Sequence, residues 1–290
     1  MPPPSAGGLP PELRPEHPLL GLGYRRPVET RELVRLDGAA RRSGAAAVAE
    51  EVPVALVYNG RPHVVMMATP ADLEDLAAGF TLSEGIVRGA ADIAGIEVER
   101  HARGVEARLR IPEEAAARLE GRGRALPGRT GCGLCGVESI EEALREPPAL
   151  PPGPVVPVEA LWRAERELPS HQGWNRETGA LHAAAWVSLE GVPEVVREDV
   201  GRHNALDKVI GALARAGRDP AAGFVVVTSR ASYELVQKAA AAGVRLLAAV
   251  SRPTGLAIAL AEASGMTLVA LLRGTTANVY AHGERIHAQP

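Results

Sequence analysis

The sequence predicts an α/β protein in which a mostly parallel sheet is flanked by helices and is preceded by a smaller α+β unit. Two observations carry this prediction. In the second half of the chain, short apolar runs alternate with amphipathic helical segments, which is typical of a sheet covered by helices. In the first half, Asn59-Gly60 separates two strand-like runs, which is the pattern of a hairpin.

The chain has 290 residues, enough for one large domain or two modest ones. Residues 1–25 are rich in proline and glycine and are expected to be a flexible tail. The remainder divides into an N-terminal α+β subdomain, a glycine-rich and proline-rich connector that holds both cysteines, and a C-terminal α/β domain. The expected boundaries are 26–121, 122–157 and 158–290.

In the N-terminal subdomain, residues 52–58 and 62–67 read as the two strands of the hairpin. Thr69-Pro70 has the composition of a helix start, so a helix is expected over 71–83. Apolar and polar residues alternate over 105–111, as in a half-buried strand.

In the C-terminal domain, helices and strands are expected to alternate along the chain. The crossover rule for parallel strands would then place the strand-to-helix junctions at one edge of the sheet. The expected helices are 158–168, 204–216, 232–242 and 255–264, and the expected strands are 181–189, 194–198, 224–228, 246–250 and 267–272.

Composition excludes several classes of protein. No run of 18 apolar residues occurs, so no membrane span is expected, and the N-terminus lacks the basic and apolar regions of a secretory signal. We therefore expect a cytoplasmic protein, without a nucleic-acid partner. The net charge is -3, yet residues 200–290 carry ten Lys or Arg against five Asp or Glu. This local excess of +5 favours an anionic ligand on the C-terminal part, although plain surface scatter accounts for it about equally well.

The chain's two cysteines lie in the sequence Gly131-Cys132-Gly133-Leu134-Cys135-Gly136. Glycines on every side give such a loop conformational freedom, which a sulfur carrier needs in order to meet both a donor and an acceptor. Nearby arginines would favour the thiolate form of the cysteines. From the motif alone, a sulfur carrier, half of a zinc site, a redox pair and bystander thiols remain comparable readings.

The expected junctions of the C-terminal sheet are rich in hydroxyl groups, arginine and glycine. Helix N-termini and arginines bind phosphate, and a ligand of an open α/β sheet lies outside the ends of its strands. We therefore expect a phosphate-bearing ligand there, with helix capping as the competing explanation. The residues expected to lie near phosphate are Ser229, Arg230, Ser251, Arg252 and Arg273.

Asp199 and His203 are four residues apart across another such junction and could form a proton-handling pair at the cofactor. His182 lies inside an apolar run and is expected to be a packed core residue rather than a catalytic one.

Four segments stand out along the chain: RTGCGLCG at 129–136, TGALHAAA at 178–185, EDVGRHNALDK at 198–208 and TSRASYELVQK at 228–238. Taken together and in this order, they resemble the FdhD family of formate dehydrogenase accessory sulfurtransferases. The resemblance extends over residues 27–286.

The resemblance implies a fold related to cytidine deaminases and a homodimer. It implies that sulfur passes from a cysteine desulfurase to the bis-molybdopterin guanine dinucleotide cofactor of molybdenum or tungsten, which is destined for the catalytic subunit of formate dehydrogenase. Cys132 would carry the persulfide, Cys135 would assist, and GDP or GMP would mimic the cofactor.

The resemblance also places a cofactor-binding segment near the C-terminus. At two of its positions this sequence departs from the family, which often has a basic and then a large apolar residue where this chain has Thr276 and Ala277. The segment comprises Leu272, Arg273, Gly274, Thr275, Thr276 and Ala277.

Two other functions remain as alternatives. One is a zinc-dependent, deaminase-like hydrolase, which needs an H-x-E motif followed by P-C-x-x-C. The chain has only His282-Gly283-Glu284, after the cysteines, so this match is taken as coincidental. The other is a non-catalytic chaperone that binds a nucleotide or the cofactor. Metal analysis tests the first alternative, and a sulfur-transfer assay tests the second.

Overall fold

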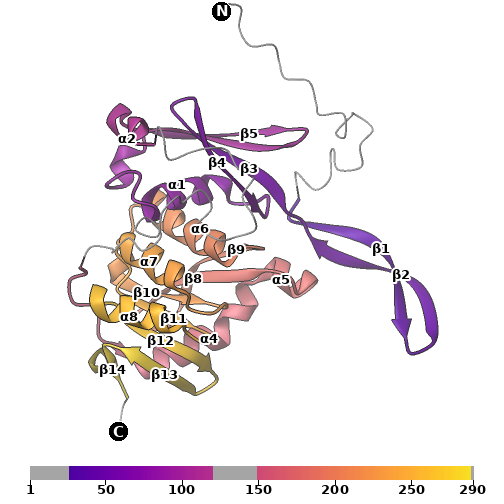
Figure 1. Ribbon diagram of the computed structural model, residues 1–290. Helices are drawn as coiled ribbons and strands as arrows, with labels where there is room; N and C mark the ends of the chain where they lie inside the picture. The colour runs from indigo at the N-terminus through magenta and orange to yellow at the C-terminus, as the bar shows by residue number, and fades with distance from the viewer. Residues whose placement is uncertain (1–25, 120–148, 289–290) are drawn as a thin grey trace, which may run out of the picture.

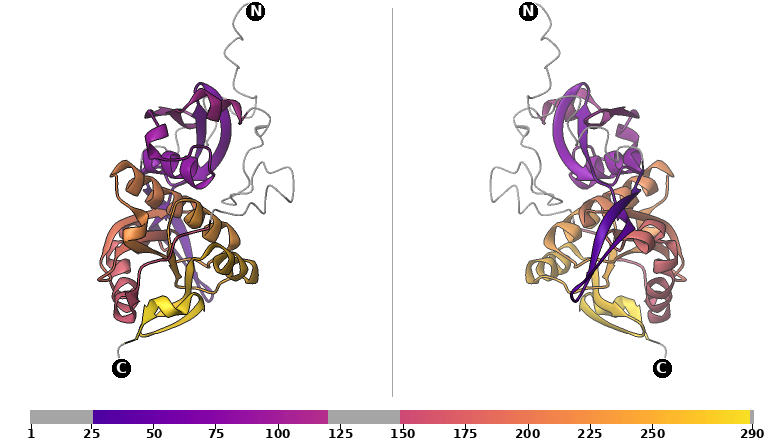
Figure 2. Two further views of the ribbon diagram at one scale, coloured as in Figure 1. Left: turned by 90° about the vertical axis from the view of Figure 1, so that its left-hand side faces the viewer. Right: turned by 90° about the vertical axis from the view of Figure 1, so that its right-hand side faces the viewer.

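A computed structural model describes residues 26–119 and 149–288 of the chain. The expected tail at 1–25 and most of the connector, including Cys132 and Cys135, lie outside the described residues. The described chain forms two parts, stacked one on the other in every view (Figures 1 and 2). In the described residues, no helix is long and apolar enough to cross a membrane.

The N-terminal part contains a four-stranded sheet in the order β4-β3-β6-β5. The expected hairpin is confirmed, because β3 and β4 pair antiparallel around Asn59-Gly60, which both adopt positive φ. The sheet packs its apolar face on helix α1. The elements are β3 (Val52–Tyr58), β4 (Arg61–Ala68), α1 (Leu73–Ser83), η2 (Ala90–Asp92), β5 (Gly95–His101), β6 (Gly104–Arg110) and α2 (Glu113–Ala117).

The start of α1 differs from the prediction. The helix begins at Leu73, after Asp72 in the left-handed conformation, and Thr69 does not cap it. Thr69 is instead fully buried, and its backbone and side chain bond to the other part of the molecule. The hydroxyl that suggested a cap is used in a long-range contact.

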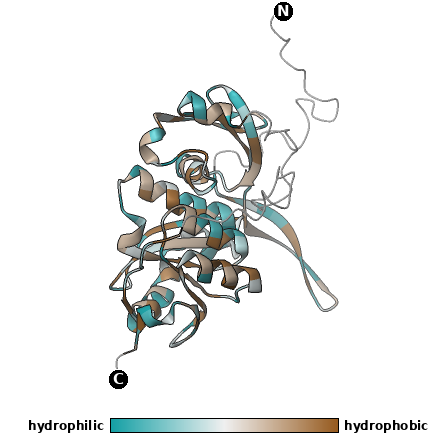
Figure 3. Ribbon diagram, turned by 60° about the vertical axis from the view of Figure 1, so that its left-hand side comes forward, coloured by the Kyte–Doolittle hydropathy of each residue, from teal (hydrophilic) through white to brown (hydrophobic). Residues whose placement is uncertain are grey.

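A second hairpin, formed by β1 (Val28–Asp37) and β2 (Ala40–Ala49), was not predicted from the sequence. It projects from the body of the molecule as an arm (Figure 1). Most of its residues are exposed, and apolar residues lie among the polar ones along its length (Figure 3). Neither strand has one buried face, so the alternation that identifies a strand in a sequence is missing.

The C-terminal part contains a six-stranded sheet in the order β13-β12-β11-β10-β8-β9. Each strand and helix expected here is present, within a few residues of its predicted bounds. The strands are β8 (His182–Ser188), β9 (Pro193–Asp199), β10 (Gly223–Val227), β11 (Leu246–Ala249), β12 (Thr267–Arg273) and β13 (Thr276–Ala281). A short pair, β7 (Val156–Pro157) with β14 (Ile286–His287), lies beside this sheet.

The prediction of a mostly parallel sheet is wrong, because the sheet is mixed. β11 pairs parallel with both β10 and β12, whereas the pairs β8–β9, β8–β10 and β12–β13 are antiparallel. Tight turns join β8 to β9 and β12 to β13, and such short connections allow only antiparallel pairing. A relationship to cytidine deaminases stays a prediction.

Helices cover both faces of this sheet. Apolar residues of α4 pack on one face, and those of α6, α7 and α8 pack on the other. The helices are α4 (Val158–His171), α5 (Gly173–Thr178), α6 (Arg202–Arg215), α7 (Tyr233–Ala241) and α8 (Gly255–Ser264), with short 3-10 turns η3 (Pro220–Ala222) and η4 (Gly283–Arg285).

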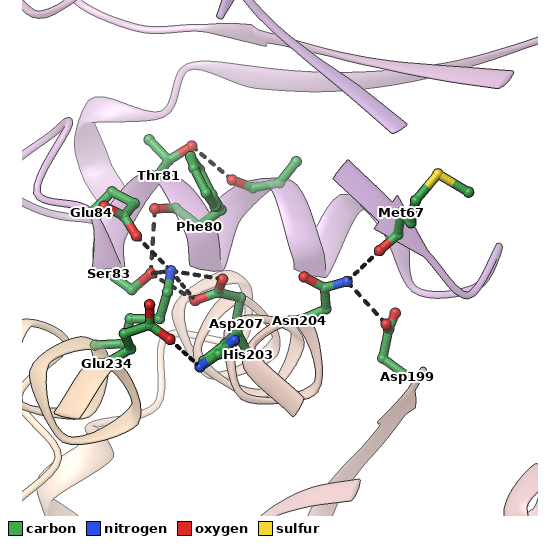
Figure 4. Close-up of polar contacts among 12 residues, drawn as sticks. Met67, Phe80, Thr81, Ser83, Glu84, Asp199, His203, Asn204, Asp207 and Glu234 are labelled. Carbon is green, nitrogen blue, oxygen red and sulfur yellow. Dashed lines mark hydrogen bonds and ion pairs between the residues drawn. The ribbon is translucent and has the colours of Figure 1, made fainter. Parts of the chain in front are cut away.

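The two parts meet where α1 crosses α6. Gly79 and Gly211 lie at the crossing, and a Cβ added to either would come within 3.0 Å of the other helix's backbone. The glycines therefore let the two helix backbones approach closely. This crossing positions the charged residues of α6 beneath the N-terminal part (Figure 4).

Candidate functional site

The strand ends of the C-terminal sheet meet at one edge, as predicted. β9 and β10 run in the same direction because both pair antiparallel with β8, and β11 and β12 continue that direction. The loops after β10 and β11 touch: the Ala231 amide donates to the Arg252 carbonyl at 3.2 Å, and the Thr254 amide donates to the Ala231 carbonyl at 3.0 Å. The Leu271 amide donates to the Ser251 carbonyl at 3.0 Å. These bonds bring Ser229, Arg230, Ser251 and Arg252 together.

Exposed arginine side chains gather at this edge. Arg230, Arg252 and Arg273 are exposed, and within residues 26–119 and 149–288 none of them forms an ion pair. Ser229 is buried, and its hydroxyl donates to the Arg230 carbonyl at 3.0 Å. The edge thus offers positive charge next to the starts of α7 and α8, where free backbone amides favour anions.

The segment from Leu272 to Ala277 comprises the end of β12, the turn at Gly274 and Thr275, and the start of β13. Leu272 is buried, whereas Arg273, Gly274, Thr275 and Thr276 are exposed and Ala277 is half-buried. The Gly274 amide donates to the Glu165 carboxylate of α4 at 3.2 Å. Just before the turn, Leu271 adopts positive φ at a break in strand register. Such a conformation is strained for a leucine and is typical of functional sites.

Asp199 lies at the same edge but faces the N-terminal part. Its carboxylate is fully buried and accepts hydrogen bonds from the amides of Thr69 and Gly201 and from the Asn204 side chain. The ammonium group of Lys208 lies 2.6 Å away. The Lys208 ammonium also donates to the carbonyl oxygens of Thr69 and Glu198. All these partners belong to the chain itself, so Asp199 holds the β9–α6 junction against the N-terminal part.

His203 and Asp199, expected as a proton-handling pair, have different partners. The Nε2 atom of His203 lies 2.6 Å from Glu234 Oε2, and both side chains are almost fully buried (Figure 4). This contact joins the first turns of α6 and α7. The expectation that either residue touches a cofactor stays a prediction.

A second buried ionic network was missed from the sequence. The Lys238 ammonium of α7 lies 2.9 Å from Asp207 of α6 and 2.8 Å from Glu84, which follows α1. The Ser83 hydroxyl donates to Asp207 at 2.6 Å (Figure 4). The pKa of Lys238 is raised: burial alone would lower it, but the carboxylates of Asp207 and Glu84 outweigh burial. The available signal was Lys238 within a mostly apolar helix, one turn after Glu234.

His182 is the first residue of β8 and is half-buried at the same edge, not packed in the core as expected. Burial lowers its pKa, and the neighbouring side chains of Arg202 and His203 lower it further, whereas Asp199 opposes them. The imidazole is therefore neutral near pH 7 and can donate or accept a hydrogen bond.

The described residues hold no group of three His, Cys, Asp or Glu side chains placed to bind a metal ion. Cys132 and Cys135 are outside them, so the carrier role expected for these cysteines stays a prediction.

Three comparisons agree. The FdhD/NarQ family model matches residues 49–287. The chain is 51% identical over 253 residues to "Sulfur carrier protein FdhD" of Bordetella petrii, covering 87% of this chain and 90% of that protein. It is 55% identical over 239 residues to the protein of the same name from Xanthomonas euvesicatoria pv. vesicatoria, covering 82% and 85%.

Among solved structures, the chain resembles one described as a formate dehydrogenase accessory protein, from Desulfotalea psychrophila. The TM-score is 0.72 at 26% identity, and the match covers 90% of this chain and 99% of that one. The family model and the two relatives span both described parts and the connector between them. The chain therefore belongs to the FdhD/NarQ family.

Proposed function

We propose that this chain is a sulfur carrier that accepts a persulfide sulfur on Cys132 and passes it to a molybdenum or tungsten cofactor bearing guanine nucleotides, for use in formate dehydrogenase. The names of the relatives support the sulfur carrier role, and the name of the structural relative supports the link to formate dehydrogenase. The single structural observation that carries the nucleotide part is the gathering of arginines without ion-pair partners, within the described chain, at one sheet edge.

In the proposed reaction, the Cys132 thiolate attacks the terminal sulfur of a persulfide on a cysteine desulfurase. The donor's sulfur–sulfur bond breaks, the donor cysteine leaves as a thiolate, and the persulfide is now on Cys132. No net oxidation or reduction occurs in this step. Cys135 is proposed to assist transfer of the sulfur onward.

The cofactor is the substrate, and its nucleotide phosphates are proposed to lie near Ser229, Arg230, Ser251, Arg252 and Arg273. GDP or GMP would occupy the same place. Arginine binds phosphate through paired, charge-assisted hydrogen bonds, so loss of one such residue should cost about 1–3 kcal/mol of binding free energy.

The proposed partners follow from the same function. They are a cysteine desulfurase, the catalytic subunit of formate dehydrogenase, and a second copy of this chain in a homodimer. The proposed location is the cytoplasm, where desulfurase and cofactor would be met.

The sulfur-carrier proposal is tested by mass spectrometry after incubation with a cysteine desulfurase and cysteine. One added sulfur, about 32 Da, should map to Cys132. Cys132→Ala should lose this adduct and fail to mature formate dehydrogenase, whereas Cys135→Ala should be impaired less. Normal maturation by Cys132→Ala would show that this residue is not the carrier.

The nucleotide part is tested separately by calorimetric titration with GDP. Arg230→Met and Arg252→Met should weaken binding, and added salt should weaken binding to the unaltered protein. Arg103→Met is the matched control, because Arg103 is exposed on the turn between β5 and β6, away from the strand ends. If all three variants bind GDP with the same affinity, the phosphates do not lie near Arg230 and Arg252.

A further inference from the structure

The starts of α6 and α7 lie side by side at the sheet edge, held by the contact between His203 and Glu234 at 2.6 Å. Each start carries a buried donor atom that has no hydrogen-bond partner among the residues that the structure describes. These atoms are the Nε of Arg202 and the hydroxyl of Ser232. Buried polar groups in folded proteins are nearly always hydrogen-bonded, so this pair of atoms calls for a partner.

Ser232 and Thr254 stand at the caps of neighbouring helices, but their hydroxyl groups bond differently. Thr254 stands at the cap of α8, and its hydroxyl accepts a hydrogen bond from the Ala257 amide at 3.3 Å. Ser232 stands at the same position of α7, but its hydroxyl makes no such bond. Ser232 therefore does not serve as a side-chain cap, and its hydroxyl is available to another group.

Carboxylates at the starts of these helices and at the end of β9 have partners other than Arg202. Asp199 pairs with Lys208, Glu234 lies against His203, and Glu198 accepts hydrogen bonds from the amides of Trp174 and Asn175. Arg202 itself forms no ion pair in the two described ranges.

His182 lies close enough to Arg202 for the two side chains to interact electrostatically. Its pKa is lowered by burial, by Arg202 and by His203, so near pH 7 it is neutral and adds a hydrogen-bonding group without a charge. Of these two residues, only Arg202 then carries a charge that favours an anion.

We propose that Arg202 and Ser232 bind an anionic oxygen group of the phosphate class, carried by the ligand that lies on this sheet edge. An arginine Nε–H can only donate, so the group that it binds must be an acceptor, and arginine favours planar or paired oxygen acceptors such as phosphate. Both residues as a whole are only partly buried, so their side chains are accessible at this edge, whereas the two donor atoms themselves are covered in this structure. This position adds to the one formed by Arg230 and Arg252, and it rests on the proposed nucleotide function.

The test is titration of the full chain with GDP, inorganic pyrophosphate and guanosine. Arg202→Met should weaken GDP and pyrophosphate binding more than about tenfold, the effect of one charge-assisted contact. Arg202→Lys should recover part of the loss, because it restores charge without the paired donors. Guanosine binding should be equal in all variants, since guanosine carries no phosphate.

Ser232→Ala provides a second variant that does not depend on Arg202, and Thr254→Ala is its matched control. Ser232→Ala should weaken pyrophosphate binding and leave the melting temperature unchanged. Thr254→Ala should lower the melting temperature, because it removes a hydroxyl that caps its helix, and it therefore shows the stability loss that Ser232→Ala should not have.

The outcomes separate this inference from the proposed function. If Arg230→Met weakens GDP binding but Arg202→Met and Ser232→Ala do not, the Arg202 position is refuted and the nucleotide proposal stands. If the unaltered protein binds neither GDP nor pyrophosphate, both are refuted. If Arg202→Met weakens guanosine binding equally, Arg202 contacts the nucleoside and the phosphate assignment is wrong.

Discussion

Replacing Lys238 with methionine is the sharpest test of how the two parts of the molecule are joined. The Lys238 ammonium lies within 3.0 Å of Asp207, Glu84 and the Ser83 hydroxyl, and 4.9 Å from the Phe80 ring centroid. The side chains of Lys238 and Asp207 are 3% and 2% exposed. Methionine has a similar length but no charge, so Asp207 would remain buried without its counter-ion.

The expected cost follows from the burial. Removing one partner of a buried ion pair costs about 3–5 kcal/mol, because the remaining charge is desolvated and uncompensated. That is a large part of a typical folding stability of about 5–15 kcal/mol. The double variant Lys238→Met with Asp207→Asn should recover much of the loss, since neither buried charge of the pair remains.

Urea denaturation with linear extrapolation measures these differences. Arg163→Met is the control, because Arg163 pairs with Glu167 along an exposed face of α4, where an ion pair is worth about 0.3–0.5 kcal/mol. The reasoning is refuted if Lys238→Met costs no more than the control, or if the double variant is as unstable as the single one.

Three further predictions concern the same junction and edge. Gly211→Ala should destabilise the protein by about 1–3 kcal/mol or more, since its Cβ would press on the α1 backbone. Gly173→Ala is the control and should not destabilise it, because open space surrounds that position. The midpoints of urea denaturation of the two variants measure this difference. Asp199→Asn should cost about 3–5 kcal/mol by leaving the Lys208 ammonium buried without a carboxylate, and a melting temperature equal to that of the unaltered protein would contradict this. Because the pKa of His182 is lowered in the folded protein, the unfolded chain binds a proton at this residue more readily. The stability that neutral His182 contributes is therefore present above about pH 6.5 and is lost as the pH falls below that value. His182→Gln should make the melting temperature depend less on pH in this range.

Local patterns identified most of the strands and helices. The Asn59-Gly60 turn was predictable because both positions take positive φ, which asparagine and glycine tolerate. The strands β10 and β12 were predictable because both are continuous apolar runs. In contrast, the arm of β1 and β2 has no continuous buried face, and only Asp37-Gly38 could have indicated its turn.

The direction of strand pairing in the mixed sheet could not be predicted from local sequence patterns. Apolar strands alternating with helices predicted parallel pairing, but pairing direction depends on each connection rather than on the strands. The connection between β8 and β9 is too short for a crossover, so the two strands form a hairpin. β8 therefore runs opposite to its neighbours β9 and β10.

By itself, the sequence determined which residue types end the strands, and chain direction then brought Arg230 and Arg252 to one edge. Only the tertiary structure decided what Asp199 and His203 contact, because their partners come from other elements. Thr69 is 130 residues from Asp199, and Glu234 lies on the next helix. The contacts between the two parts depend on the close crossing of α1 and α6, where two glycines lack the side chains that would hold the helix backbones apart. The spacing between two helices that are far apart in the chain cannot be predicted from the periodicity of either one.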